Sequence, residues 1–214
     1  MTNRNSRMWM DRPDRYGWVS RLLHWTMAYL LIWQFLVILT WRLFGDRNWV
    51  TTVTSLGPGH GTVGLLVIGL VVIRAIWALV HRKRRPVQSQ SVSGFAAVAV
   101  HVSFYVLMFT IPGLALLRAY GSGKGWEPWI PASGVEVSWM MTPANLLHGM
   151  LAWYLSILIA GHVIMALVHQ LRWRDQTLGR MTGRLDKSVA TGERPLKHAT
   201  PNPAPKQAPK QRRG

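Results

Sequence analysis

The chain of 214 residues contains no cysteine. Without cysteine it can form no disulfide bond, no iron–sulfur cluster and no thiolate–metal bond. Covalent attachment of haem through a C-x-x-C-H motif is excluded for the same reason. Any haem in this protein therefore has to be held noncovalently.

Acidic residues are also scarce, because 8 Asp and Glu stand against 25 Lys and Arg, giving a net charge of +17 at pH 7. Four apolar runs contain no Asp or Glu, and they cover residues 22–44, 60–80, 95–117 and 146–171. Each run approaches or exceeds the ~20 residues that cross a bilayer as a helix. A soluble four-helix bundle would carry a polar stripe along each helix, which these runs lack. The sequence therefore predicts an all-α integral membrane protein, a bundle of four transmembrane helices over residues 22–181.

The positive charge is divided unevenly between the two sides of such a bundle. Residues 1–21 hold five Lys and Arg, residues 81–94 hold four, and the chain from residue 172 onward holds eleven. The other two connections, 42–59 and 118–145, hold two each. Because basic connections stay in the cytoplasm, we expect both termini there. This distribution explains the charge without nucleic acid as a partner.

The two ends of the chain flank the predicted bundle. Residues 1–21 form a basic N-terminus without a small-residue cleavage site after a short apolar core, so we expect the first span to be retained. Residues 182–214 form a basic tail rich in Pro, Lys and Gln, for which we predict disorder. Binding of this tail to anionic lipid is one alternative, and RNA binding is a weaker one.

Four histidines fall at matched levels in these runs. His24, His60 and His148 lie near the start of an apolar run, and His162 follows His148 by fourteen residues. Fourteen residues of α-helix rise about 21 Å and leave the two side chains roughly 40° apart. In antiparallel spans, His60 and His148 then lie near the outer face and His24 and His162 near the inner face. The simplest interpretation is two bis-histidine iron sites, one above the other.

The residue four positions after each of these histidines is small. These residues are Ala28, Gly64, Ala152 and Ala166. Positions four apart share a helix face, so a flat porphyrin could lie beside each ligand. Zinc hydrolases and di-iron carboxylate bundles need carboxylates that the spans lack. Two b haems remain, although any single histidine could instead form a hydrogen bond between helices.

Two arginines are candidates for partners of the haem propionates. Arg21 precedes His24 by three residues and shares its helix side. Arg74 lies inside the second run, about 21 Å below His60 and so at the level of the inner pair. The alternative for Arg74 is that it extends to the cytoplasmic surface. We expect His81 to lie in a basic turn and His101 to be a packing or interfacial residue.

With these residues identified, the chain resembles the bacterial cytochrome b561 family over residues 15–181. The resemblance is carried by Arg21-Leu22-Leu23-His24-Trp25, Gly59-His60-Gly61-Thr62-Val63-Gly64, Ile111-Pro112-Gly113-Leu114, the spacing of His148 and His162, and Trp173-Arg174-Asp175-Gln176-Thr177-Leu178. It implies a four-helix cytochrome of the bacterial cytoplasmic (inner) membrane, with two b haems held by the four histidines. It also implies exchange of electrons between quinone and periplasmic partners, and superoxide oxidation is associated with the family. His169 matches a family histidine close to the inner haem.

Bis-histidine iron has no open position for a substrate, so the haems should relay electrons. Our leading hypothesis is transmembrane electron transfer linked to the quinone pool of the respiratory chain. We expect quinone at the inner end, near His169, Arg74 and His101. One alternative is the membrane-anchor subunit of a periplasmic hydrogenase or formate dehydrogenase, and another is a superoxide:quinone oxidoreductase. The sequence leaves the oligomeric state open, with a homodimer among the alternatives.

Overall fold

The computed structural model describes residues 6–86, 91–173, 175 and 177–183. Among these residues, four helices are long and apolar enough to cross a membrane, as predicted. They are α2 (Trp18–Phe44), α4 (His60–Val80), α5 (Val92–Gly121) and α6 (Ser138–Val168). Shorter helices are α1 (Ser6–Trp9), α3 (Asn48–Thr54), a 3₁₀ turn (Arg82–Arg84) and α7 (Thr177–Thr182). A π-helical turn, His169–Trp173, continues α6.

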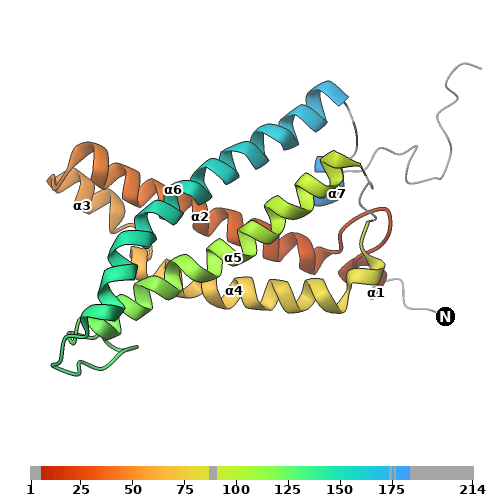
Figure 1. The fold of residues 1–214 in the computed structure, drawn as a ribbon. Helices are drawn as coiled ribbons and strands as arrows, with labels where there is room; N and C mark the ends of the chain where they lie inside the picture. Colours follow the sequence, from red (N-terminus) through yellow and green to blue (C-terminus); the bar gives the residue numbers. More distant parts are fainter. Residues whose placement is uncertain (1–5, 87–90, 174, 176, 184–214) are drawn as a thin grey trace, which may run out of the picture.

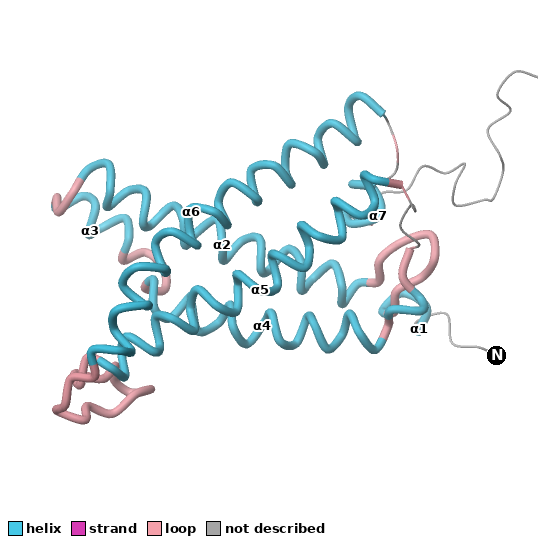
Figure 2. The backbone as a smooth tube through the Cα atoms, viewed as in Figure 1, coloured by secondary structure: helices cyan, strands magenta, loops and turns pink. Residues whose placement is uncertain are grey.

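The helices pack as a sequence of neighbours. Helix α2 packs on α4, α4 on α5, and α5 on α6, whereas α6 has hardly any close backbone approach to α2 or α4. Figure 1 shows α1, α7 and the start of α2 at one end, with α3 and the connection between α5 and α6 at the other. The tube in Figure 2 makes the same antiparallel arrangement visible. The arrangement confirms the predicted four-helix membrane bundle.

Some helix ends differ from the apolar runs. Helix α4 begins at His60 as predicted, but α6 begins at Ser138, eight residues before its apolar run. The connection between α5, which ends at Gly121, and α6 is therefore shorter than the connection predicted over residues 118–145. Helix α3 was not predicted, because its sequence is too short and too polar to stand out from the surrounding connection. Apolar content marks the part of a helix inside the hydrocarbon, whereas the helix itself continues into the interface.

A small apolar core joins α2, α4 and α5, and Leu155 of α6 belongs to it as well. Helix α4 contributes Val63, Val67 and Val71, which repeat every four residues and so lie on one face. Large apolar side chains outside this core are exposed, such as Tyr29 at 68% and Ile157 at 66%. A soluble protein rarely exposes so much contiguous apolar surface. This surface fits contact with lipid, in agreement with a multi-pass membrane protein.

The turn before α4 fixes the position of His60. Gly57 lies so close to Trp33 that a Cβ atom there would come within 2.6 Å of the indole ring. The indole N–H of Trp33 donates a hydrogen bond to the carbonyl oxygen of Pro58, at 3.0 Å. Gly59 is the N-cap of α4 and has an extended conformation. The chain therefore enters α4 against α2, with His60 as the first helical residue.

The buried carboxylate of Asp11 joins three segments at the end of the bundle where the N-terminus lies. Asp11 is 2% exposed and accepts hydrogen bonds from Gly17 N–H at 2.8 Å, Ser20 Oγ at 2.9 Å and Arg85 Nε at 3.1 Å. The hydroxyl of Ser20 also accepts a hydrogen bond from the indole N–H of Trp77, at 2.9 Å. The side chain of Asp11 thus connects the segment before α2, the first turn of α2 and the connection after α4.

We expect Asp11→Ala to destabilise the protein by about 2 to 3 kcal/mol, because it leaves charged and backbone donors without an acceptor. Asp14→Ala is the matched control, since Asp14 is exposed and its ion pairs with Arg12 and Arg15 are 3.4 and 3.7 Å long. Exposed pairs of this kind contribute less than about 1 kcal/mol. Thermal unfolding in detergent, followed by tryptophan fluorescence, compares the two variants. Equal melting temperatures for both would contradict the role given to Asp11.

Candidate haem sites

The pair predicted to lie near the outer face, called the outer pair below as His24 and His162 are called the inner pair, comes from α4 and α6. The ring centroids of His60 and His148 are 6.1 Å apart, and their planes meet at 68°. The Nδ1 atom of His148 lies 2.9 Å from the carbonyl oxygen of Ile111. Because a carbonyl oxygen only accepts, Nδ1 must carry the proton and donate it. This hydrogen bond leaves Nε2 of His148 as the atom that can bind a metal.

The inner pair comes from α2 and α6. The ring centroids of His24 and His162 are 6.4 Å apart, and their planes meet at 63°. Metal–nitrogen bonds to imidazole are about 2 Å long, so two imidazoles on opposite sides of one metal ion have ring centroids roughly 6 Å apart. Both pairs fit this spacing. The backbone of α6 stays apart from those of α4 and α2, which carry the other ligand of each pair. This separation leaves room for a flat group between the two rings.

The donor set favours haem over other metal centres. Among the described residues, no group of three or more His, Asp or Glu side chains could hold a metal ion. Each pair thus offers two imidazoles and no further metal ligand. An iron ion with two such axial ligands needs its remaining bonds from the cofactor itself, as a porphyrin provides. The side chains at both levels therefore fit a b-type haem.

Gly64, the small residue one turn after His60, also lies close to α5. A Cβ atom at Gly64 would lie 3.5 Å from Cβ of Pro112, which is an ordinary van der Waals contact. Gly64 therefore also serves the packing of α4 on α5. Its predicted place beside a porphyrin stays a prediction, with helix packing as a second reason for a small residue.

Arg74 points toward the inner pair. Its guanidinium donates a hydrogen bond to the carbonyl oxygen of Ser20, at 3.3 Å, and a second nitrogen lies 3.3 Å from Nδ1 of His24. If His24 binds iron through Nε2, its Nδ1 carries a proton and cannot accept from Arg74. The guanidinium nitrogen is then free for another acceptor. A haem propionate is such an acceptor, so the predicted role of Arg74 fits the geometry.

Arg21 contacts the backbone of α7. One terminal nitrogen of its guanidinium donates to the carbonyl oxygen of Thr182, at 2.7 Å, which connects α2 to α7. Its Nε atom is buried and has no hydrogen-bond partner. The predicted contact of Arg21 with a propionate stays a prediction, and it would use this free donor.

The other histidines separate into two groups. His101 lies with its ring centroid 5.4 Å from that of His162, at 90°, so it packs edge-on against an inner ligand. The depth predicted for His101 therefore agrees with the structure. His81 stacks on Trp77 at 3.9 Å, in the turn after α4. His81 thus lies away from both histidine pairs, as expected.

His169 has a partner that the sequence reasoning missed. Its Nδ1 atom is hydrogen-bonded to the carboxylate of Asp175, and its ring packs against Trp173 at 4.4 Å. Burial alone would raise the pKa of Asp175, but hydrogen bonds from His169 and Thr177 outweigh this effect and hold the pKa below its usual value. Asp175 therefore stays ionised at neutral pH. The π-helical turn that carries His169 is of a kind often found at functional sites.

Gln34 is a second residue that the sequence reasoning missed. Its Nε2 atom donates to the carbonyl oxygen of His60, at 3.0 Å, and lies 3.5 Å from the Nε2 atom of that residue. Gln34 carries the only side-chain amide in residues 22–44, and this rarity in an apolar run was the available signal.

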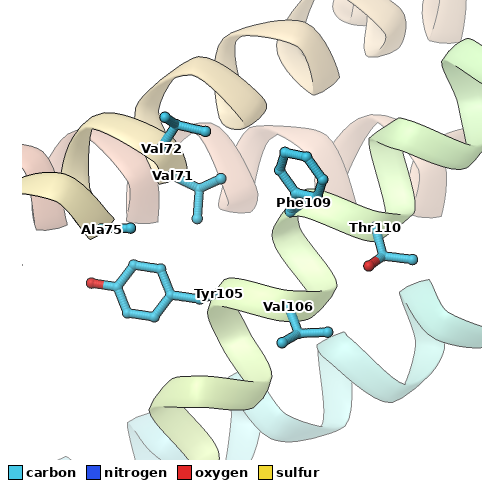
Figure 3. Close-up of a pocket in the computed structure, with 7 residues that line it drawn as sticks. All are labelled: Val71, Val72, Ala75, Tyr105, Val106, Phe109 and Thr110. Atoms are coloured by element: carbon cyan, nitrogen blue, oxygen red, sulfur yellow. The ribbon is translucent and has the colours of Figure 1, made fainter.

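A groove on the flank of the bundle lies between α4 and α5, with a volume of about 340 Å³ (Figure 3). Its lining is apolar, for example Val71, Ala75 and Phe109, and the side-chain hydroxyls of Tyr105 and Thr110 are its polar atoms. The lining contains no histidine, the residue type of the two pairs, and its apolar surface suits lipid chains.

Comparison with known proteins identifies the family of this chain. The sequence model of the prokaryotic cytochrome b561 family matches residues 15–184. Cytochrome b561 homolog 2 of Escherichia coli (strain K12) is 32% identical over 187 residues, which cover 81% of this chain and 94% of that relative. The four long apolar helices agree with a membrane cytochrome. The chain therefore belongs to the prokaryotic cytochrome b561 family, membrane cytochromes that bind b-type haem and transfer electrons.

Proposed function

We propose that this protein transfers electrons across the bacterial cytoplasmic (inner) membrane through two noncovalent b haems and exchanges electrons with quinone. The observation that carries the proposal is the geometry of the two imidazole pairs, with ring centroids 6.1 and 6.4 Å apart. His148 and His162 lie on one helix, and their separation of fourteen residues corresponds to a rise of about 21 Å. Two such sites divide the path of an electron across a hydrocarbon core about 30 Å thick into shorter steps.

The side chains around the sites suit an electron relay. Bound haem supplies one-electron chemistry at its iron. His60 with His148 and His24 with His162 would hold the two haems, and a metal held by two imidazoles would have no place for a substrate to bind. The hydrogen bond from His148 to Ile111 holds that ligand in one orientation. The apolar residues of the core keep water away from the path between the two levels.

The charge distribution supports an orientation with both termini in the cytoplasm. The first turn of α2, α7 and the connection after α4 lie at one end of the bundle, joined through Asp11, Arg85 and Arg21. This is the end that carries most of the basic residues. Under the positive-inside rule, His24 and His162 then form the cytoplasmic pair and His60 and His148 the periplasmic pair.

We place the quinone site at the cytoplasmic end, near His169. Reduction of quinone takes up protons together with electrons, and an imidazole can accept and release protons near neutral pH. His169 follows His162 by seven residues, a rise of about 10.5 Å and a rotation of roughly 20° away from the ligand. Its partner Asp175 has a side chain that is 41% exposed, so the pair extends from the helix end to the surface. These features support proton uptake from the cytoplasm.

Two alternatives on the periplasmic side fit the same two haems. A membrane-anchor subunit for a periplasmic hydrogenase or formate dehydrogenase would use the same two haems. A superoxide:quinone oxidoreductase would also use them, with superoxide as the donor. Reduction of the purified protein by quinol and by superoxide, measured separately by haem absorbance, distinguishes the donors. Copurification with a large metalloenzyme would support the anchor role.

We predict two noncovalent haems per chain, measured by a pyridine haemochrome assay on protein of known concentration. His60→Ala and His148→Ala should each remove the outer haem alone, and His24→Ala and His162→Ala the inner haem alone, because each variant removes one axial ligand. His81→Ala is the control, since His81 stacks on Trp77 away from both pairs. One haem per chain in the unmodified protein would refute the two-haem proposal.

We predict that Gly64→Leu lowers outer-haem occupancy, because the larger side chain enters the space beside His60 and meets Pro112. Gly69→Leu on the same helix is the matched control, since nothing lies within 4 Å of a Cβ atom at Gly69. Occupancy is read from the absorbance ratio of haem to protein. Normal haem content in Gly64→Leu would show that no small residue is needed at this position.

We predict that His169→Leu keeps both haems and their spectra but slows electron exchange with quinone. Loss of a proton-transferring group costs on the order of 10²-fold in rate. Asp175→Asn should slow exchange less, since it removes only the charge that orients His169. Stopped-flow oxidation by a soluble quinone measures the rates, with His81→Leu as control. Unchanged kinetics in a fully haem-loaded His169→Leu protein would move the quinone site to the outer end.

A further inference from the structure

Two buried polar atoms beside the outer site have no hydrogen-bond partner among the residues that the structure describes. They are Nδ1 of His60 and Oε1 of Gln34. The two side chains belong to α4 and α2, and Nε2 of Gln34 lies 3.0 Å from the carbonyl oxygen of His60 and 3.5 Å from Nε2 of its ring. Buried polar atoms in proteins are nearly always paired, and the membrane interior holds no water to pair them. Two such atoms in touching residues therefore call for a common explanation.

The chemistry of a ligating histidine makes these two atoms complementary. When a neutral imidazole binds a metal through Nε2, its proton is on Nδ1, which becomes a donor. Oε1 of Gln34 is an acceptor. The terminal torsion of a glutamine side chain is broad, so rotation of the Gln34 amide would present Oε1 to the ring in place of its hydrogen bond to the carbonyl oxygen of His60. The pairing thus satisfies both atoms in the haem-bound protein.

We infer that Gln34 is the hydrogen-bond acceptor for Nδ1–H of His60 and a positioning residue of the outer haem. This inference rests on the proposed function, since it assumes that His60 binds iron. It also gives the two outer ligands equivalent surroundings, because Nδ1–H of His148 already donates to the carbonyl oxygen of Ile111. An acceptor on the far nitrogen makes an imidazole a stronger electron donor to iron. Gln34 thereby stabilises the oxidised outer haem.

The inner site differs in a way that makes the test specific. There, Nδ1 of His24 faces the guanidinium of Arg74, which is a donor and not an acceptor. Removal of Gln34 should therefore affect one haem and leave the other unchanged. Thr40 offers a matched control on the same helix, because its hydroxyl is bonded only to the carbonyl oxygen of Leu36 one turn earlier.

The test is a redox titration of purified, haem-loaded Gln34→Leu, Gln34→Glu and Thr40→Val proteins. Leucine is of similar size but accepts no hydrogen bond, so the midpoint potential of the outer haem should rise. Outer-haem affinity should also fall by about tenfold, as for other partners that orient metal ligands. Glutamate keeps an acceptor oxygen, so its outer potential should stay near the original or move lower. The inner-haem potential should stay constant in all three proteins.

The alternative is that Gln34 only donates to the carbonyl oxygen of His60 and acts through packing. In that case Gln34→Leu and Gln34→Glu should shift the outer potential in the same direction, which would overturn the inference. An unmoved outer potential in a two-haem Gln34→Leu protein would overturn it as well, while leaving the proposed function intact. A single haem that depends on His24 and His162 alone would refute both.

Discussion

The absence of water inside the membrane is the constraint on which the rest of this structure depends. A polar side chain in a transmembrane helix has to find its partner within the protein. Two polar side chains of the spans accordingly lie beside the histidines, Arg74 near His24 and Gln34 near His60, whereas Thr40 bonds to its own helix. The lipid-facing surface is left almost wholly apolar. The position of polar groups in this bundle thus marks the levels at which a cofactor fits.

This concentration of polar groups explains why so much could be predicted from sequence. The bounds of α4 and the depth of His148 and His162 follow from apolar length and helical rise, which are local properties. Gln34 and Asp175 escaped prediction because their meaning comes from partners on another helix or beyond a turn. Asp11 escaped for the same reason, since its partner Arg85 is more than seventy residues away. The predicted tail over residues 182–214 lies almost entirely outside the described residues.

The contact of Arg21 with α7 could not be predicted from helical spacing, because its partner Thr182 is far away in the sequence. Its spacing from His24 gave it the correct helix side, but the carbonyl oxygen of Thr182 takes one of its donors. Helix α7 packs at the start of α2 through this contact, which the periodicity of either helix does not indicate. The same contact ties the closing segment of the chain to the first turns of α2, with the indole N–H of Trp25 donating to Met181. The described end of the chain therefore belongs to the folded bundle.

The two histidine pairs have surroundings that suit different tasks. The outer pair contacts a backbone carbonyl and a neutral amide, from Ile111 and Gln34, which hold ligands but exchange no protons. The inner pair contacts a guanidinium and a third imidazole, from Arg74 and His101. Under the proposed function, proton-coupled reduction of quinone fits the inner end better, because proton transfer needs titratable groups and electron transfer does not. The outer end then needs only to pass electrons, and neutral partners suit that role because they hold the ligands without adding or releasing charge.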